Sequence, residues 1–478
     1  MFFNSLDFAI FLPIVFVLYW FGTFKKLKLQ NLLLLLASYY FYASWDFRFL
    51  FLLMASTLLD YFTGLKIFDS KQNKTRSFWL WLSIIINLGF LGFFKYYNFF
   101  VDSFAQLISS FGVSTSIWTL NIILPVGISF YTFHGLSYVF DIYRNKTKPT
   151  RNFIQYAVFV SFFPLLVAGP IERATHLLPQ IQKKRKFEYL NAVDGLRQIL
   201  WGLFKKIVIA DNCAHYVDII FNDYAKYSGS TLVLGVIFFA IQIYGDFSGY
   251  SDIALGTARL FGIELLQNFS FPYFSRDIAE FWRRWHISLS SWFKDYLYIP
   301  LGGSRGSIWM RVRNTFIIFL VSGFWHGANW TFIVWGALHA VYFLPLMLLR
   351  KNRTHLNIVA KGRFFPSFKE VTQIGLTFIL TSFAWIFFRA ETVSMALLYI
   401  RGIYSRSLLT LPEIAPIPIL LLVILFLATE WLQREKQHAL QIDNSVIPKM
   451  ARWGIYFVII TLIFNYGGTS QQFIYFQF

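Results

Sequence analysis

His326 is the residue of this sequence whose type and surroundings best suit chemistry inside a membrane. It lies in an uncharged run of 36 residues, positions 314–349, where Trp325 and Gly327 flank it. Neutral imidazole is the least costly basic group to bury at that depth, and an imidazole pKa near about 6.5 suits proton abstraction. We therefore take His326 as a candidate general base.

The other histidines fit simpler interpretations. His339 follows His326 by 13 residues, which would put the two about 140° apart on a continuous helix, so we expect His339 in the core. His134, in FYTFHGLSY, stays open between core and site. The histidines near charged or polar stretches are expected at the surface: His176, His215, His355 and His438.

Two aspartates follow a strongly apolar stretch. Asp246 and Asp252 lie in TLVLGVIFFAIQIYGDFSGYSDIALG (231–256), among glycines and serines that allow close helix approach. A carboxylate at membrane depth costs a few kcal/mol unless it is paired or faces water, which makes both residues functional candidates. The simpler interpretation, which we favour, is that they cap helices at the membrane edge or form structural pairs.

The composition requires membrane helices to position these residues. Of 478 residues, 56% are hydrophobic and 14% are charged, whereas a soluble domain carries about a quarter charged residues. The apolar residues suffice for roughly 11 to 13 spans, and the long unbroken apolar runs exclude a β-barrel, a disordered chain and a soluble multi-domain enzyme. We predict an all-α polytopic integral membrane protein with several broken or re-entrant helices.

The positive charge lies in short clusters between the apolar runs. The formal net charge is +19, and the positive-inside rule with anionic membrane lipid accounts for it without a nucleic acid partner. The first run, Leu6 to Phe21, precedes Lys25, Lys26 and Lys28, which predicts an uncleaved first helix with its N-terminus outside. The single cysteine, Cys213, excludes an internal disulfide; we expect no metal and no bound cofactor.

The run 314–349 must be interrupted. As one helix it would be ~54 Å long, too long for a hydrocarbon core of ~30 Å. Between Ser322 and Asn329 the sequence SGFWHGAN is rich in glycine and polar residues, so we expect the break there. His326 would then lie near a helix end.

A second interrupted segment is expected at residues 153–170. It contains Pro164 and Gly169-Pro170, and proline removes a backbone donor that lipid cannot replace. Basic clusters stand on both sides of it, at 144–151 and at 173–186. We therefore predict a re-entrant or broken segment that leaves the membrane on the side it entered.

The segment RDIAEFWRRWHISLSSWFKDYLYIPLGG (276–303) carries aromatic and leucine side chains at the helical period, with charged residues opposite. This pattern predicts an amphipathic helix of ~20 residues at the membrane interface, stopped by Pro300. His286 falls on its apolar side. A lone histidine there is usually a satisfied core residue.

Four stretches resemble the membrane-bound O-acyltransferase (MBOAT) family, in its AlgI-like branch of bacterial alginate O-acetyltransferases. They are FFPLLVAGPIERA (162–174), YGDFSGYSDIALG (244–256), FSRDIAEFWRRWHISLSSWFKDYLYIPLGGSRG (274–306) and SGFWHGANWTFIVWGALHA (322–340). The resemblance covers almost the whole chain. It implies one domain over residues 1–478, a ring of tilted helices around a central funnel and tunnel, with peripheral spans in 1–150, a catalytic region in 151–349 and C-terminal spans in 350–478.

The resemblance also implies site residues. His326 corresponds to the membrane-embedded catalytic histidine of the family, and His286 to the second, upstream histidine. His326 would act as general base on the acceptor hydroxyl or position it, and His286 would orient the acceptor or stabilise the oxyanion. The candidate tunnel residues are Trp282, Trp285, Trp325 and Asn329.

The implied reaction moves an acetyl or other acyl group from a cytoplasmic thioester donor, acetyl-CoA or an acyl carrier, for O-acetylation of an extracytoplasmic polysaccharide such as alginate. The implied setting is a bacterial inner membrane, crossed several times by the chain. The implied partner is a periplasmic acetyltransferase that completes transfer to the sugar.

Two alternatives remain. D-alanyl transfer from a carrier protein to a cell-wall polymer belongs to the same family. An ion- or proton-coupled transporter could use Asp246, Asp252 and the histidines as a relay. Against the transporter, no internal repeat is visible, whereas many transporters are built from repeats.

Overall fold

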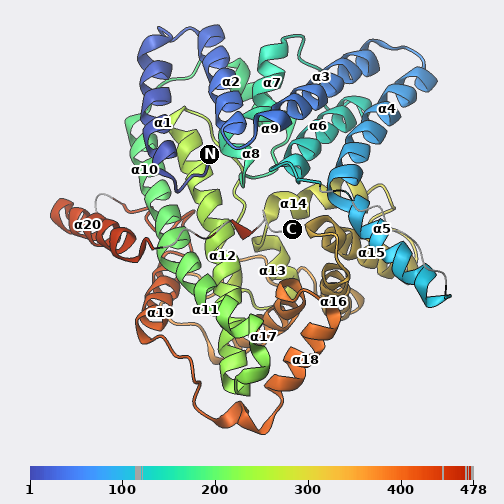
Figure 1. Cartoon of the computed structure of the whole chain (residues 1–478). Helices are drawn as coiled ribbons and strands as arrows, with labels where there is room; N and C mark the ends of the chain where they lie inside the picture. The colour runs from blue at the N-terminus through green and yellow to red at the C-terminus, as the bar shows by residue number, and fades with distance from the viewer. Residues whose placement is uncertain (113–119, 121, 444–445, 469–470, 472, 475–478) are drawn as a thin grey trace. The chain divides into compact units, whose positions relative to one another are not determined.

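The computed structural model describes residues 1–112, 120, 122–443, 446–468, 471 and 473–474. These residues form helices joined by turns and loops, with no strand among them (Figure 1). The chain divides into two compact units. The first comprises Met1–Ala192 and Thr257–Leu266, and the second comprises Val193–Gly256 and Gln267–Phe478. The boundaries cut through α10 (Tyr189–Leu203) and α12 (Gly229–Leu260). The prediction of an all-α chain is confirmed.

The helices of the first unit pack around polar as well as apolar contacts. Asp60 is buried and accepts hydrogen bonds from Ser83 (2.6 Å) and Asn87 (2.8 Å), which stabilise a carboxylate inside the helices. Gly135 leaves room for it, since a β-carbon there would overlap the carboxylate. The helices are α1 (Leu6–Val17), α2 (Leu27–Ala43), α3 (Phe47–Asp69), α4 (Asn73–Leu91), α5 (Tyr97–Ser110), α6 (Ile128–Tyr143), α7 (Phe153–Ser161), α8 (Phe163–Leu166) and α9 (Ala174–Gln182).

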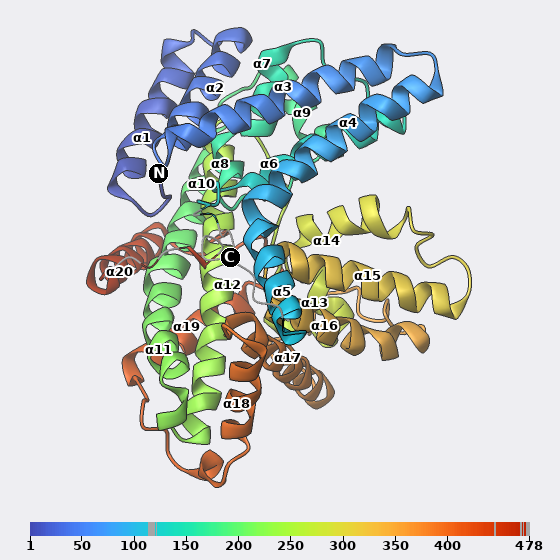
Figure 2. The same cartoon turned by 45° about the vertical axis from the view of Figure 1, so that its right-hand side comes forward.

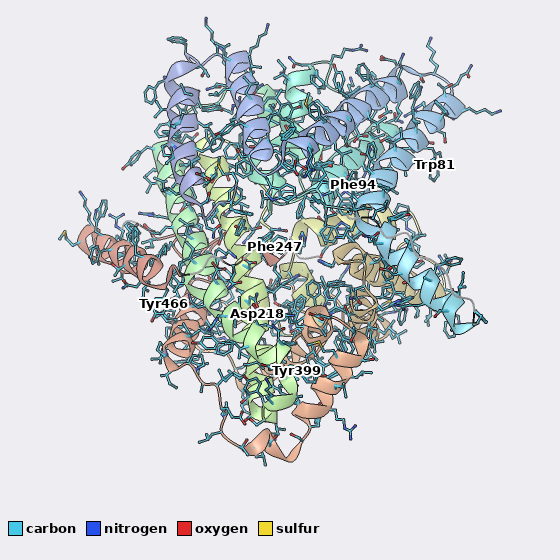
Figure 3. The ribbon with its side chains drawn as sticks, in the orientation of Figure 1. Trp81, Phe94, Asp218, Phe247, Tyr399 and Tyr466 are labelled. Atoms are coloured by element: carbon cyan, nitrogen blue, oxygen red, sulfur yellow. The ribbon has the colours of Figure 1, made fainter. Side chains whose placement is uncertain are left out.

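The second unit holds most of α10 and α12 and the helices that follow. Gly202 and Gly249 let α10 and α12 approach closely, because a β-carbon on either would crowd the other's carbonyl oxygen. Tyr399, labelled in Figure 3, donates its hydroxyl to the carbonyl of Leu232 (2.8 Å). The remaining helices are α11 (Asp211–Asn222), α13 (Ile278–Arg284), α14 (Ile287–Phe293), α15 (Ile308–His326), α16 (Trp330–Leu348), α17 (Phe368–Arg389), α18 (Val393–Ile403), α19 (Ile417–Leu432) and α20 (Lys449–Tyr466).

Five of the described helices are long and apolar enough to cross a membrane: Phe47–Asp69, Asn73–Ser110, Gly229–Leu260, Trp330–Leu348 and Phe368–Arg389. Large apolar side chains on their outer faces are exposed, among them Trp81 (57%) on α4 (Figure 3) and Ile379 (64%) on α17. Exposed apolar surface on this scale needs lipid around it. The chain is therefore a polytopic membrane protein, and the number of spans stays a prediction.

Residues 153–170 are interrupted, as predicted. α7 ends at Ser161, and α8 is one short turn that carries Pro164 in its first residues. The backbone N–H of Phe163, freed by the break, donates to the hydroxyl of Ser38 (3.0 Å). With nine residues, α7 is too short to cross a bilayer. The side on which the segment leaves stays a prediction.

The run 314–349 is interrupted between His326 and Trp330, which confirms the predicted break. α15 and α16 lie side by side in Figure 2. Their close approach depends on Gly323 and Gly336, since a β-carbon on either would overlap a backbone carbonyl of the neighbouring helix. Asn329 caps α16 by accepting the N–H of Thr331 (3.0 Å). His326 is the last residue of α15.

The single interfacial helix predicted for 276–303 is wrong. The segment forms α13, α14 and a π-helical turn at Lys294–Tyr298, with His286 in a left-handed conformation (φ 43°) between α13 and α14. Asn268 causes the break: its carbonyl accepts the N–H of Ile287 (2.9 Å), and its side chain accepts the N–H of Ser288 (3.3 Å). The apolar side chains of the segment, such as Phe281 and Leu289, are buried inside the unit instead of facing lipid.

Candidate active site

His326 is buried at the C-terminal end of α15, with 3% of its surface exposed. Three aromatic rings surround its imidazole, with centroids 4.8 Å (Trp325), 5.1 Å (Trp335) and 5.4 Å (Phe388) away. These rings come from α15, α16 and α17, so the α15–α16 hairpin and α17 together position the histidine. The predicted placement of His326 near a helix end is confirmed, and its depth in the bilayer stays a prediction.

His286 is held by Asn268. The Nδ1 atom of His286 lies 3.0 Å from Oδ1 of Asn268, which also accepts the hydroxyl of Ser288 (2.9 Å). The backbone N–H of Ser288 donates to the same oxygen (3.3 Å), which identifies Oδ1 as the acceptor, and the amide nitrogen of Asn268 donates to the hydroxyl of Ser251 (3.2 Å). His286 therefore carries its proton on Nδ1, and its Nε2 has the basic lone pair. Burial lowers the pKa of His286 to about 3, so the imidazole is neutral.

Trp325 contacts both histidines. Its ring centroid lies 6.0 Å from that of His286 and 4.8 Å from that of His326. Phe247 of α12, labelled in Figure 3, packs against His286, with the two ring centroids 4.7 Å apart. The structure thus brings together two imidazoles that the sequence separates by α14 and most of α15. Two buried imidazoles in an aromatic cluster can accept or position a proton away from bulk water.

Trp282 connects this cluster to the third buried histidine of the region. Its indole N–H lies 3.3 Å from Nδ1 of His339, and the ring of Trp335 lies between His339 (4.9 Å) and His326 (5.1 Å). His339 is buried in the core, as predicted. The sequence did not predict that His339 lies near His326, because an angle between two residues on one continuous helix does not apply where the helix is broken.

A chamber of about 760 Å³ opens beside α13, α14, α15 and α16. Its wall is apolar, with Trp282, Phe319 and Phe343 among the lining residues. Five cationic residues also line it: Arg283, Lys294, Arg311, Arg350 and Arg353. Ser322, one helical turn before His326 on α15, lines it as well. A volume of this size is typical of a pocket for a small-molecule ligand.

The remaining predicted tunnel residues do not line this chamber. Trp285 is 1% exposed and packs between Phe281 (5.4 Å) and Trp385 (5.1 Å). Asn329 caps α16 and donates its amide to the carbonyl of Glu391 (2.8 Å). Of the four candidates, Trp282 lines the chamber and Trp325 links the histidines, while Trp285 and Asn329 hold the surrounding structure.

Asp246 and Asp252 lie inside α12 and are paired, so the structural pairing is confirmed and the capping is not. Asp252 contacts Lys205 (2.6 Å) and accepts the amide of Gln198 (2.8 Å). Asp246 contacts Lys206 (2.7 Å) and accepts the N–H of Ile474 (2.7 Å). The lysines were missed because they stand 40 residues or more before their partners in the sequence.

Two further histidines have structural partners. His134, left open by the sequence, is buried and its Nε2 accepts the N–H of Glu172 (3.0 Å). His438, expected at the surface, is 2% exposed and contacts Asp194 (3.2 Å), so that expectation is wrong. Among the described residues, no group of three or more potential protein ligands for a metal ion lies together.

Comparison with known proteins identifies relatives of the chain. Residues 144–389 match the family model described as MBOAT, membrane-bound O-acyltransferase family. The chain is 41% identical to the probable alginate O-acetylase AlgI of Pseudomonas aeruginosa over 407 residues, 85% of this chain and 75% of the relative. It is 38% identical to the peptidoglycan O-acetyltransferase of Helicobacter pylori over 425 residues, 83% and 78% of the two chains. The teichoic acid D-alanyltransferase of Bacillus subtilis is 30% identical over 289 residues, 57% and 70%.

Proposed function

Because the chain belongs to the membrane-bound O-acyltransferase family, we propose that it supplies acetyl groups for O-acetylation of an extracytoplasmic polysaccharide, with His326 as its general base. O-acyltransferase activity follows from the family. Relatives that match more than four-fifths of the chain are named for acetylation of alginate and of peptidoglycan, both polysaccharides. Alginate is the acceptor class that we favour.

The observation that carries the proposal is the position of His326. The imidazole is buried at the end of α15, one helical turn after Ser322, which lines the ligand-sized chamber. From this position a base can reach an acceptor hydroxyl and a thioester. His326 takes the proton of the hydroxyl while the hydroxyl oxygen bonds to the thioester carbonyl carbon. The carbon–sulfur bond breaks, and the leaving thiolate takes the proton from His326. Protons and charge balance without a further reactant.

His286 is suited to a different step. Its Nδ1–H is engaged by Asn268, and its neutral Nε2 can accept a hydrogen bond from the acceptor hydroxyl. It would therefore orient the acceptor beside His326 instead of donating to an oxyanion. This orientation restricts the hydroxyl to one approach and raises the rate by positioning.

The chamber supports a thioester donor that carries phosphates, such as acetyl-CoA. Arg350 and Arg353 are exposed where they line it, whereas Arg311 is half-buried and its Nε has no hydrogen-bond partner among the described residues. Phosphate oxygens would satisfy these guanidinium groups. The apolar wall at Trp282 and Phe319 would contact the part of the donor that carries the acyl group. The thioester would then lie near Ser322 on α15.

The finer setting follows the same proposal. The multi-pass chain would lie in a bacterial inner membrane, take its donor from the cytoplasm, and pass acetyl groups to an extracytoplasmic acetyltransferase that modifies the polymer. D-alanyl transfer is less favoured, since the D-alanyltransferase relative matches at lower identity and over a shorter part of the chain. The transporter hypothesis is also less favoured, because Asp246 and Asp252, the carboxylates of its relay, are paired with lysines.

The test is acetyl transfer from labelled acetyl-CoA by the full chain in membranes. His326→Ala should lower transfer by about 10²–10⁴-fold at unchanged membrane abundance, because it removes the base. The exposed His215 offers a matched control, and His215→Ala should retain activity. Arg350→Gln with Arg353→Gln should raise the KM for acetyl-CoA more than it lowers kcat. Full activity of His326→Ala, or transfer only from a D-alanyl carrier, contradicts the proposal.

A further inference from the structure

A second pocket in the first unit has the lining of an anion site. It measures about 340 Å³ and is lined by Trp20, by residues of the segment 180–191 and by residues of the turn 259–264. We call it the basic pocket. It shares no lining residue with the chamber beside α15, and the reaction proposed above does not use it.

Cationic residues dominate the basic pocket. Five of them line it, Lys183, Lys184, Arg185, Lys186 and Arg259, against two carboxylates. One carboxylate, Glu264, is occupied by Arg259 at 3.3 Å. The other four cations are consecutive in the stretch between α9 and α10, where no helix separates their side chains. Such a concentration of charge on a membrane protein attracts anions.

Arg185 is the part of the basic pocket that needs a ligand. It is 8% exposed, whereas the three lysines are exposed. Its Nη2 donates to Oδ1 of Asn31 (2.5 Å), and its guanidinium lies 5.5 Å from the ring of Tyr19. Its Nε and Nη1 are buried without a hydrogen-bond partner among the described residues. Unsatisfied buried charged donors are costly, and a bound oxyanion would satisfy them.

The turn at 259–264 closes against this arginine. Gly262 has a positive φ of 70°, which other residues adopt with strain, and an added β-carbon would lie 3.5 Å from the β-carbon of Arg185. The turn therefore lies against the backbone end of the Arg185 side chain. The basic pocket is a built cavity around Arg185, not an open cluster of surface lysines.

The surroundings of the basic pocket indicate a lipid. Phe187 (48% exposed), Tyr189 (70%) and Leu190 (70%) follow the cations directly in the chain. Phe187 also packs edge-on against Trp20 in the pocket wall, with centroids 5.5 Å apart. Exposed aromatic and aliphatic side chains next to a group of cations are typical of the level of lipid headgroups. We infer that the basic pocket binds the phosphate of an anionic phospholipid headgroup, with Arg185 as its central contact.

The experiment compares lipids on the purified full chain. Binding of phosphatidylglycerol and of phosphatidylcholine is measured by native mass spectrometry, with glycerol 3-phosphate and inorganic phosphate as soluble probes. Phosphatidylglycerol should bind selectively and raise the unfolding temperature. Removing one lysine should weaken the binding of phosphatidylglycerol about fivefold. The variants are Lys184→Gln, Lys186→Gln and Arg185→Gln, and Lys71→Gln, an exposed lysine between α3 and α4, is the matched control.

Each outcome decides the inference. Selective binding that Lys184→Gln and Lys186→Gln weaken while Lys71→Gln does not supports it, even where Arg185→Gln fails to fold. Equal loss with Lys71→Gln shows a diffuse surface effect and overturns it. Binding of the soluble phosphates as strongly as of phosphatidylglycerol assigns the basic pocket to a free phosphate ester and overturns the lipid. Acetyl transfer by the lysine variants should be unchanged in neutral lipid, so failure here is distinct from failure of the catalytic proposal.

Discussion

The side chain of Asn268 fixes the proton of His286. Its Oδ1 lies 3.0 Å from Nδ1 of the histidine, and its amide is oriented by the hydroxyl of Ser251 at 3.2 Å. The same Oδ1 accepts the hydroxyl of Ser288. Asn268 is thus a positioning residue that selects one tautomer and also holds the chain between α13 and α14. An asparagine 18 residues upstream decides which nitrogen of His286 carries the proton.

Replacing Asn268 with aspartate should introduce a pH dependence. A carboxylate beside Nδ1 stabilises the imidazolium, so it raises the pKa of His286 from its burial-lowered value of about 3. Acetyl transfer by Asn268→Asp should therefore show an additional loss as the pH drops through the new pKa of His286, which the wild-type profile lacks. The measurement is the pH profile of transfer at equal membrane abundance. Profiles of the same shape would show that Asn268 does not act through His286.

Gly323 positions His326 through the packing of α15 on α16. A β-carbon at this residue would overlap the carbonyl oxygen of Phe332, which cannot move without moving α16. Gly323→Ala should lower the unfolding free energy by about 1–3 kcal/mol. It should also lower acetyl transfer by about 10²-fold, since a displacement of about 1 Å suffices for that loss.

The matched control for Gly323→Ala is Gly375→Ala on α17. No atom lies within 4 Å of a β-carbon there, so alanine should stabilise the helix by about 0.5–1 kcal/mol and leave transfer unchanged. Thermal unfolding and transfer are measured on both variants. Equal behaviour of the two glycines would rule out the close packing of α15 and α16 as the cause.

Long-range contacts decide where prediction from the sequence fails. The break before Trp330 was predictable, because a single helix of 36 uncharged residues would be longer than a bilayer is thick. The break at His286 was not, since the helical period continues across it and the residue that causes it, Asn268, is outside the segment. His438 follows the charged residues Glu435 and Lys436 in the sequence, yet its side chain is buried and contacts Asp194. Local pattern gives element type and length; partners from distant segments decide burial and breaks.

His176 should make stability depend on pH. Its hydrogen bond to the buried Glu172 (2.8 Å) raises the pKa of the histidine above its usual 6.5. Since the folded pKa is the higher one, this stabilisation is fully present below about pH 6.5 and is lost as the pH rises through the folded pKa. Wild-type protein should therefore lose more thermal stability than His176→Gln between about pH 6 and 8. The exposed His215→Gln should follow the wild type; a His176→Gln curve parallel to the wild type would refute the linkage.

Lys206 should couple to Asp246 as a structural pair. Its buried Nζ contacts Asp246 (2.7 Å), Asp211 (2.7 Å) and the carbonyl of Gln471 (3.0 Å). Lys206→Met leaves two buried carboxylates without a cation and should lower the unfolding free energy by about 3–5 kcal/mol. Asp246→Asn in the Lys206→Met background should then cost less than it does alone, because it removes one of the uncompensated charges. A double-mutant cycle on thermal unfolding measures this coupling, and additive losses would contradict it. Acetyl transfer per folded molecule should be unchanged in these variants. If Asp246 were part of a proton relay, Asp246→Asn would instead lower transfer without lowering stability.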